Sequence, residues 1–292
     1  MDWRKIVDTF KLSYDLNLLK NENIIDKIYF RKRVIDSNSY GWEANCYLSS
    51  SLGVRFPSKM IHSNSHGMGS DYIKNRAISK SISEAIERWA YFETKNKKCE
   101  DYIISPNTSG FSAFPRKLKK QARDTSIYEA YERWCLFELN KNRLSLEYKI
   151  DQGEFIYFHF NNELKIFFAI IEQNLDLDRS AYGFAAARSL KDCLFKARVE
   201  KNRNIFNLNY FKKNNLKIEN LDRNERRLIY FSTNEGNNYF KSLLNLKNKV
   251  RTPKMLYSKE VEGKWSKYSA VWRTVFDIDP IIHDNKLQVF YF

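Results

Sequence analysis

Two stretches of the chain repeat one arrangement of carboxylates and an arginine. Residues 81–93 read SISEAIERWAYFE and residues 126–138 read SIYEAYERWCLFE, and the two agree at nine of thirteen positions. In each copy two glutamates lie three residues apart and an arginine follows the second: Glu84, Glu87 and Arg88, then Glu129, Glu132 and Arg133. Carboxylates that project side by side repel each other unless a cation lies between them. Such residues could bind Mg²⁺, and the arginines could bind the phosphate that usually accompanies it.

Each copy has the periodicity of an amphipathic helix. At about 100° per residue, Ile82, Ile86 and Trp89 fall on one side of the first copy, and its glutamates and arginine fall on the other. A solvated polar face is the ordinary interpretation of such a helix, and a glutamate–arginine pair four residues apart contributes only about 0.3 kcal/mol. The second copy favours a functional interpretation, in which four carboxylates on two facing helices converge on one site.

A third predicted helix carries one more carboxylate. It covers residues 191–206, where Lys196, Glu200 and Arg203 share one face. On its own, this face is also typical of an ordinary surface helix. Directed at the same cavity as the first two helices, it would add one metal ligand and two cations.

The segments around these helices predict a mixed fold. We expect loops rich in Gly and Ser at residues 61–71 and 105–115, ahead of the first and second helix, and a small-residue turn at residues 179–190 ahead of the third. Short runs of β-branched and aromatic residues at 154–160 and 164–173 predict buried strands. Helices and strands in this order indicate an α+β (mixed α/β) fold rather than an all-helical one.

Length and composition favour one large domain. With 292 residues, 43% of them hydrophobic, the chain can bury a core. We expect a single domain with an N-terminal segment at 1–45, a core at 46–204 and a C-terminal segment at 205–292 whose role the sequence leaves open. No apolar run is long enough for a membrane span, and the start has no signal peptide. Four scattered cysteines without a CxxC motif argue against zinc and disulfides, so we expect a soluble, cytoplasmic protein.

The chain is strongly basic. Its formal net charge is +15, with basic clusters at residues 31–33, 116–120 and 223–227. Two explanations of this charge are equally good. One is an AT-rich genome, which favours Lys and Asn codons, and the other is a function in which the positive field attracts polyanions. Because the sequence contains no recognised nucleic-acid-binding module, nucleic-acid binding is a minor alternative. A steep salt dependence of DNA binding would support it.

Three segments in order resemble the YcaO family. They are HGMGS with AISKSISEAIERW, TSGF with SIYEAYERW, and YGFAAARSLKDCLFKARVEKNR. In the family they correspond to a glycine loop with a first E-x-x-E-R helix, a small-residue loop with a second such helix, and a late glycine turn with a third helix. The resemblance covers residues 46–204. It implies a YcaO-type domain with an internally duplicated loop–helix element and a nucleotide-binding core over this range.

The resemblance implies an ATP- and Mg²⁺-dependent enzyme without a Walker A loop, and the sequence has no such motif. In this family a Cys, Ser or Thr side chain adds to a backbone amide, ATP phosphorylates the resulting oxyanion, and loss of phosphate leaves an azoline. The residues that would bind Mg²⁺ are Glu84, Glu87, Glu129, Glu132 and Glu200. Those that would contact ATP are Gly67, Gly69, Ser81, Arg88, Arg133, Lys196 and Arg203. The two glycines would let backbone N–H groups approach the nucleotide.

Several positions depart from the family pattern. Met68 stands where a lysine is common, Lys80 where a serine is common, Trp134 where an aspartate is common, and Arg203 where a glutamine is common. The chain ends in QVFYF and lacks the proline-rich end of many azoline-forming members. These differences leave two alternatives open: a thioamide-forming enzyme of the same family, and a non-catalytic scaffold of the same fold.

The resemblance also implies partners. An enzyme of this kind modifies a ribosomally made precursor peptide, as in bacteriocin biosynthesis. The sequence shows no obvious extra domain for capture of a leader peptide, so we expect a leader-peptide-binding or ubiquitin-activating-like partner protein. A homodimer is a further option, and neither nucleic acid nor a membrane is expected as a partner.

Overall fold

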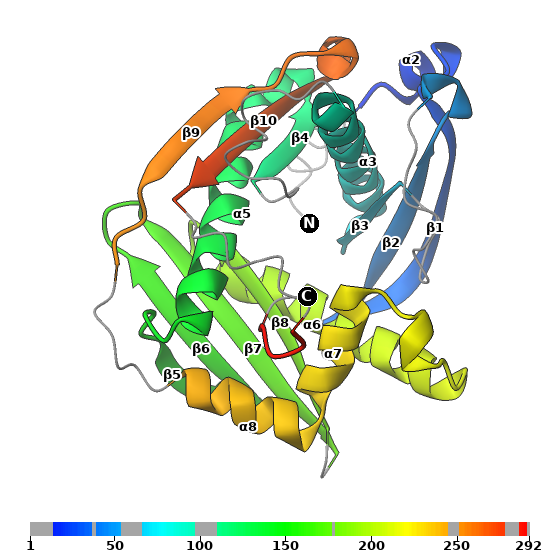
Figure 1. The fold of residues 1–292 in the computed structure, drawn as a ribbon. Coiled ribbons are helices and arrows are strands. Elements are labelled where there is room, and N and C mark those ends of the chain that lie inside the picture. Colours follow the sequence, from blue (N-terminus) through cyan, green and yellow to red (C-terminus); the bar gives the residue numbers. More distant parts are fainter. Residues whose placement is uncertain are drawn as a thin grey trace. The chain divides into compact units, whose positions relative to one another are not determined.

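The computed structural model describes residues 14–36, 39–53, 66–96, 110–176, 179–244, 251–277 and 286–290. Contacts divide the chain into two compact units (Figure 1). The first unit takes in Met1–Ala130 and Met255–Val275, and the second takes in Tyr131–Lys254 and Phe276–Phe292. Each unit combines helices with antiparallel strands, which confirms the predicted α+β class. The single domain stays a prediction.

The first unit contains a three-stranded sheet covered by a long helix. After the short helix α2 (Leu16–Asn21) the strands β1 (Ile25–Asp36), β2 (Ser39–Leu48) and β3 (Gly67–Asp71) pair antiparallel in that order. The helix α3 (Lys74–Asn96) packs on β2 and β3. It confirms the first predicted helix and contains the whole first copy of the repeat, residues 81–93.

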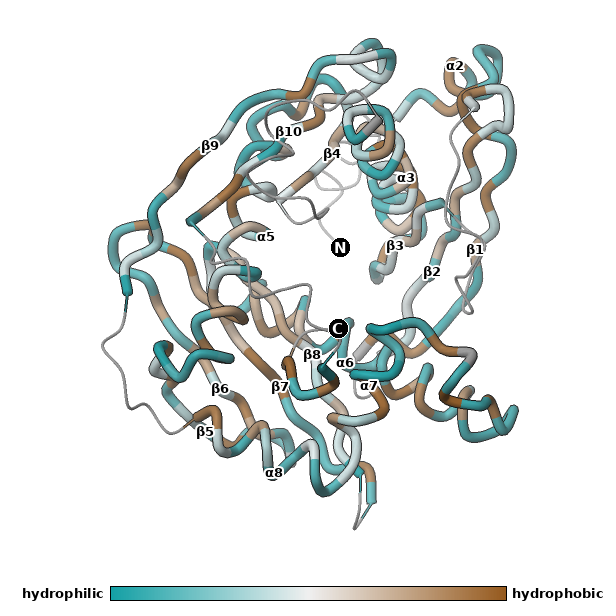
Figure 2. The backbone as a smooth tube through the Cα atoms, viewed as in Figure 1, coloured by the Kyte–Doolittle hydropathy of each residue, from teal (hydrophilic) through white to brown (hydrophobic). Residues whose placement is uncertain are grey.

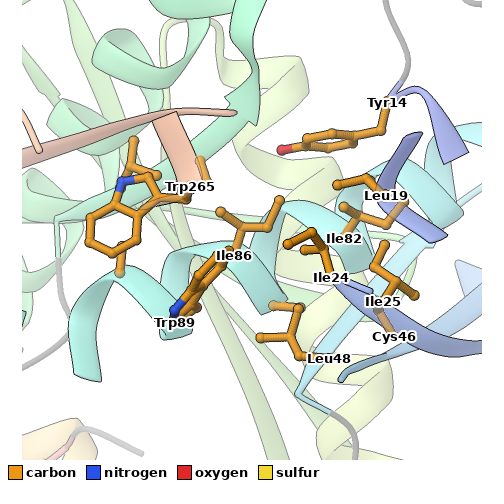
Figure 3. Packing of buried hydrophobic residues seen from close by; sticks show 14 of the residues in the cluster. Tyr14, Leu19, Ile24, Ile25, Cys46, Leu48, Ile82, Ile86, Trp89 and Trp265 are labelled. Carbon is orange, nitrogen blue, oxygen red and sulfur yellow. The ribbon is translucent and has the colours of Figure 1, made fainter. Parts of the chain in front are cut away.

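The core of the first unit lies between this sheet and α3. Figure 3 shows Ile82, Ile86 and Trp89 of the helix in one hydrophobic cluster with Leu48 and Cys46 of the sheet. The indole of Trp89 meets that of Trp265 edge to face, with ring centroids 5.8 Å apart. The predicted apolar face of the helix is therefore its buried face.

A second sheet of the first unit has the order β4–β10–β9. Its strands are β4 (Phe111–Pro115), β10 (Ser269–Phe276) and β9 (Met255–Glu260). β10 pairs antiparallel with β4, which places Arg273 opposite Phe111. Short 3₁₀ turns are η1 (Ser50–Leu52), η2 (Arg116–Leu118), η3 (Ile218–Asn220) and η4 (Lys264–Lys267).

The helix α5 (Lys119–Asn140) carries the second copy of the repeated phrase and contributes residues to both units. The second unit continues with a four-stranded antiparallel meander, in which each strand pairs with the next along the chain. The strands are β5 (Glu147–Asp151), β6 (Glu154–Asn161), β7 (Ile166–Asp176) and β8 (Arg179–Ala187). β6 and β7 confirm the two predicted buried strands.

Three helices complete the second unit. The helix α6 (Leu190–Lys213) packs on β7 and β8 and starts after Ser189, whose side chain accepts the backbone N–H of Asp192. The helices α7 (Arg223–Ser232) and α8 (Asn234–Leu243) follow. Figure 2 shows hydrophilic residues along each long helix. Within the described part of the chain, none is long and apolar enough to cross a membrane.

The two predicted loops and the predicted turn are wrong over most of what the structure describes of them. Gly67–Asp71 is strand β3, Phe111–Pro115 is strand β4, and the predicted turn at residues 179–190 is mostly strand β8, buried from Ser180 to Ala187. The remainder of the first loop, residues 61–65, and residues 105–109 of the second lie outside the described residues. Gly, Ser and Ala are typical of loops. In β3 and β8, however, their small side chains allow a helix to pack close to the strand backbone.

This close approach is visible at two glycines. A Cβ atom at Gly67 would lie 2.1 Å from the carbonyl oxygen of Ser81 and 2.3 Å from the nitrogen of Ala85 in α3. A Cβ at Gly183 would lie 2.1 Å from the carbonyl oxygen of Ala197 and 2.3 Å from the nitrogen of Lys201 in α6. Because each obstacle is helix backbone, an added methyl group has no side chain to push aside.

We therefore predict that Gly67→Ala and Gly183→Ala each lower the free energy of unfolding by about 2–3 kcal/mol, the range of an overpacked core. Gly53→Ala is the matched control, because Gly53 has φ of 65° and open space around it. Its cost should be about 1 kcal/mol, from the left-handed backbone alone. Chemical denaturation measures all three, and equal losses would contradict the close packing.

Candidate functional site

The first unit brings three of the predicted glutamates together. Glu87 of α3 interacts electrostatically with Glu129 of α5 and with Glu84, one turn away on its own helix. Glu87 is partly buried, and this burial is the main cause that raises its pKa well above the ordinary value. Repulsion from Glu129 and then from Glu84 raises it further. The expected convergence of the repeated carboxylates is therefore observed for these three residues.

Cations oppose this repulsion. Arg88 donates from Nη2 to Oε1 of Glu84 over 2.5 Å, and its charge also lowers the pKa of Glu87. Arg273 of β10 acts on Glu87 in the same direction. Arg88 was predicted as a phosphate contact and does lie with the glutamates.

Arg273 is a residue of this group that sequence reasoning could not assign. Its side chain is 1% exposed, and its guanidinium lies 4.5 Å from the ring centroid of Phe111. The pairing of β10 with β4 brings it there from a position far beyond α3 in the chain. No local sequence pattern indicates that Arg273 lies near Glu87, because only the pairing of β10 with β4 brings the two residues together.

The glycines position Glu84 instead of lining a loop. The backbone N–H of Met68, between Gly67 and Gly69, donates to Oε2 of Glu84 over 2.8 Å. Both glycines face α3, since a Cβ at Gly69 would also lie 2.2 Å from the carbonyl oxygen of Ala77. They were expected to expose N–H groups to a nucleotide, but here they press a strand against a helix and direct one N–H at a glutamate.

Ser81 is not brought into the charged group. Its side chain is fully buried, and its hydroxyl donates to the carbonyl oxygen of Ile78 in the same helix over 2.8 Å. Nothing in this position supports the expected contact with ATP.

The second unit holds the other predicted residues. Glu132 of α5 accepts a hydrogen bond from the backbone N–H of Ala186 over 3.2 Å. Burial raises the pKa of Glu132 to about 7, against the lowering effect of Arg133, Lys196 and the Ala186 hydrogen bond. Both cations were predicted to contact phosphate, and both act on this carboxylate.

Glu200 of α6 lies beside Glu132. Burial raises the pKa of Glu200 to about 8, and the charge of Glu132 is the next cause. Arg203, the backbone N–H of Phe184 and Arg133 favour the ionised form. The structure thus joins Glu132 and Glu200 as a second carboxylate group with its own arginines.

The same backbone hydrogen bond positions a glutamate in each of the two units. The spacing in sequence from Gly67 to Glu84 equals the spacing from Gly183 to Glu200. In each case the residue after the glycine, Met68 or Phe184, donates its backbone N–H to that glutamate. The sequence repeat relates α3 to α5, whereas this packing makes the pair β3–α3 equivalent to the pair β8–α6.

A lysine at equivalent positions of α3 and α6 interacts with different residues in the two units. Lys80 and Lys196 both lie one helical turn before the bound glutamate. Lys80 donates to Oδ2 of Asp71 over 2.7 Å and to the carbonyl oxygen of Ser70. In the second unit Ala187 occupies the place of Asp71, and Lys196 acts on Glu132. Lys80 therefore bonds to the strand next to its own helix, whereas Lys196 interacts electrostatically with Glu132.

The two carboxylate groups suit a Mg²⁺ ion that is bound together with phosphate better than one whose ligands all come from the protein. Among the described residues, no three His, Cys, Asp or Glu side chains lie close enough together to hold a metal alone. Mg²⁺ is usually bound through one or two carboxylates together with phosphates and water. The pairs Glu87 with Glu129 and Glu132 with Glu200 supply that number, and a divalent cation would relieve the repulsion that raises the pKa of Glu87 and of Glu200.

Comparisons with known proteins give a likeness in structure. No family model matches the sequence, and no curated protein matches it. A chain of the Escherichia coli microcin synthetase McbBCD complex with pro-MccB17 bound is similar, with a TM-score of 0.55 and 13% identity over 85% of this chain and 86% of that chain. A chain of the same complex described without the peptide gives a TM-score of 0.52 and the same identity and coverage. At this identity the likeness shows the fold alone.

The raised pKa of Glu200 predicts a pH-dependent stability. A carboxyl with a folded pKa of about 8 and an ordinary unfolded pKa binds more protons when folded. Unfolding therefore becomes easier as the pH rises from about 4.5 to 8. Glu200→Gln should lose the part of this decline that Glu200 causes, while Glu87 and Glu132 keep theirs. The variant should therefore be more stable than the wild type at pH 8.5, by on the order of 1 kcal/mol.

Chemical denaturation at pH 5 and pH 8.5, with a chelator present, measures this difference. Glu163→Gln is the matched control, because Glu163 is exposed in the β6–β7 turn and should follow the wild type. A Glu200→Gln variant that loses as much stability with pH as the wild type would show that Glu200 is ionised throughout.

Proposed function

We propose that this chain is a YcaO-type enzyme that uses Mg²⁺ and ATP to activate a backbone amide of a ribosomally made peptide, giving azoline heterocycles. The observation that carries the proposal is the gathering of partly buried glutamates and of arginines within each unit, on a fold similar to that of a microcin synthetase chain. Burying like charges side by side costs stability, and cation and phosphate binding would recover that cost.

ATP, when bound, supplies the phosphoryl group that turns the amide oxygen into a leaving group. A cysteine, serine or threonine of the peptide adds to the amide carbon, its proton is lost, and the oxyanion formed takes the phosphoryl group. Loss of phosphate and of the amide proton then leaves the C=N bond of the azoline. The reaction asks the protein mainly to position groups and to neutralise charge, as phosphoryl transfer generally does.

The chain's own residues suit that task. Glu84, Glu87 and Glu129, with Glu132 and Glu200, are the carboxylates proposed to hold Mg²⁺. Arg88, Arg133, Arg203 and Lys196 are the cations proposed to neutralise phosphate oxygens. Arg273 is added to this set, because it is buried and acts on Glu87. The N–H groups of Met68 and Phe184 hold Glu84 and Glu200 in place.

A thioamide-forming enzyme would need the same charged groups and differs only in the nucleophile, which would be sulfide. A non-catalytic scaffold is the remaining alternative, and the ion pair between Glu84 and Arg88 supports it, since this pair stabilises α3 without any ligand. The proposed partners are a precursor peptide and a protein that binds its leader, with a homodimer as a further option.

Calorimetric titration of Mg²⁺–ATP into the purified chain tests the proposal. The wild type should bind ATP only in the presence of Mg²⁺. Glu87→Gln changes the first group and Glu200→Gln the second, and each should weaken binding at least tenfold, about 1.4 kcal/mol, if both groups contribute. A loss in one variant alone would assign the nucleotide to that unit.

Glu163→Gln serves again as the control and should bind as the wild type does. The decisive contrary result is a wild type that binds no ATP with Mg²⁺, with or without a precursor peptide. Binding that both Gln variants retain in full would mean that the nucleotide lies away from the glutamates, and the role proposed for them would be withdrawn.

A further inference from the structure

The strand β1 forms an edge of its sheet (Figure 1). One side of β1 pairs with β2, and among the described residues no strand pairs with its other side. Tyr29 is 58% exposed, Phe30 45% and Val34 43%. An edge this long, with large apolar residues on both faces, is a template for the addition of another strand.

Cations alternate with these apolar residues. Lys27, Arg31, Lys32 and Arg33 lie in the segment KIYFRKR, which contains no acid. Successive strand residues face opposite sides, so Tyr29, Arg31 and Arg33 share one face and Phe30, Lys32 and Val34 the other. Both faces therefore offer an apolar surface next to positive charge.

The neighbouring strand shows which side chain suits this edge. Glu43 of β2 lies opposite Arg31, accepts from its guanidinium over 2.7 Å, and also pairs with Arg33. The Arg31 side chain is still 58% exposed and can meet a second carboxylate from the other side. On the opposite face, Lys74 of α3 lies 3.5 Å from the ring centroid of Phe30, which adds one more cation.

The same charges argue against a second copy of the chain as the occupant. Antiparallel pairing of β1 with itself would place Arg31 opposite Arg33 in the register centred on Lys32, and Lys27 opposite Arg33 in the register centred on Phe30. Like charges directly opposite each other across strands are destabilising. A strand in which two apolar residues are followed by two acidic ones would instead place apolar side chains beside Tyr29 and Phe30 and carboxylates beside Arg31 and Lys32, on both faces.

We propose that the outer edge of β1 binds an extended acidic segment of the peptide substrate by strand addition. Main-chain hydrogen bonds would join the segment to β1, its carboxylates would pair with Arg31 and Lys32, and its apolar side chains would cover Tyr29 and Phe30. The identity of the occupant rests on the proposed function, whereas the preference for an acidic strand rests on the edge itself.

Fluorescence anisotropy with a labelled peptide of repeating Glu-Glu-Val-Val (the Glu–Val peptide), added to the full chain, tests the charge preference. The Lys27→Glu/Lys32→Glu double variant should raise the dissociation constant of this peptide at least about tenfold. Lys149→Glu is the matched control, because Lys149 is exposed on another edge strand, β5, and should bind as the wild type does. A peptide of repeating Lys-Lys-Val-Val should bind the double variant better than the wild type, which a misfolded variant could not do.

N-methylation of the Glu–Val peptide tests strand addition. Methyl groups on every second backbone nitrogen, placed in either of the two frames, remove the N–H groups that face β1 in one frame and those that face away in the other. One frame should abolish binding and the other should leave it nearly unchanged. Equal binding of both frames would overturn strand addition.

Three other results would overturn the proposal. They are no binding of the Glu–Val peptide to the wild type, equal weakening by Lys149→Glu, and displacement of the peptide by a short single-stranded DNA, which would assign the edge to polyanions in general. A concentration-dependent dimer in sedimentation that Lys32→Glu alters would assign it to a second copy. The peptide assay contains no ATP, so its outcome does not depend on Mg²⁺–ATP binding. Either of the two proposals can therefore be contradicted while the other is supported.

Discussion

The contact between a strand backbone and a helix backbone at Gly67 and Gly183 is the constraint on which the charged groups depend. Only a residue without Cβ leaves room for the helix carbonyl 2.1 Å from where that atom would be. At this separation the next N–H along the strand reaches a glutamate on the helix that follows. A bulkier residue would move the helix away from the strand, and the hydrogen bond that fixes the glutamate would be lost with it. Close packing and placement of the carboxylate are therefore one feature.

Placement of this kind makes buried like charges tolerable. Glu87 and Glu200 each have a neighbouring glutamate, and both have a raised pKa. A fold selected for stability alone would replace one member of each pair, because an uncompensated buried carboxylate is costly. Backbone N–H groups and arginines limit the cost here without removing it. The remaining cost is the physical reason to regard these groups as a site rather than as a structural ion network such as that of Lys201 with Glu154, which are 2.5 Å apart and oppositely charged.

The sequence predicts those parts of the structure that apolar spacing and β-branched or aromatic runs encode. The helices α3, α5 and α6 follow from regular apolar spacing, the strands β6 and β7 follow from short runs of β-branched and aromatic residues, and the glutamates follow from their positions on the helices. The sequence predicts loops or a turn where β3, β4 and β8 lie, because a composition rich in Gly, Ser and Ala does not distinguish a loop from a strand packed against other elements. Arg273 escaped assignment because strand pairing alone brings it near Glu87, and the N–H groups of Met68 and Phe184 escaped because backbone groups have no residue signature.

The equivalence of β3–α3 and β8–α6 changes how the departures from the family pattern are understood. Lys80 stands where a serine is common, which by itself would argue for a lost site. Lys80 and Lys196 occupy the same position in the two elements, but Asp71 binds the first and Ala187 leaves the second to act on Glu132. A lysine at this position is therefore compatible with both a structural and a site role, and the strand residue opposite decides between them. The departure at Lys80 thus affects the first element alone, and the carboxylates and cations of the second element remain assembled.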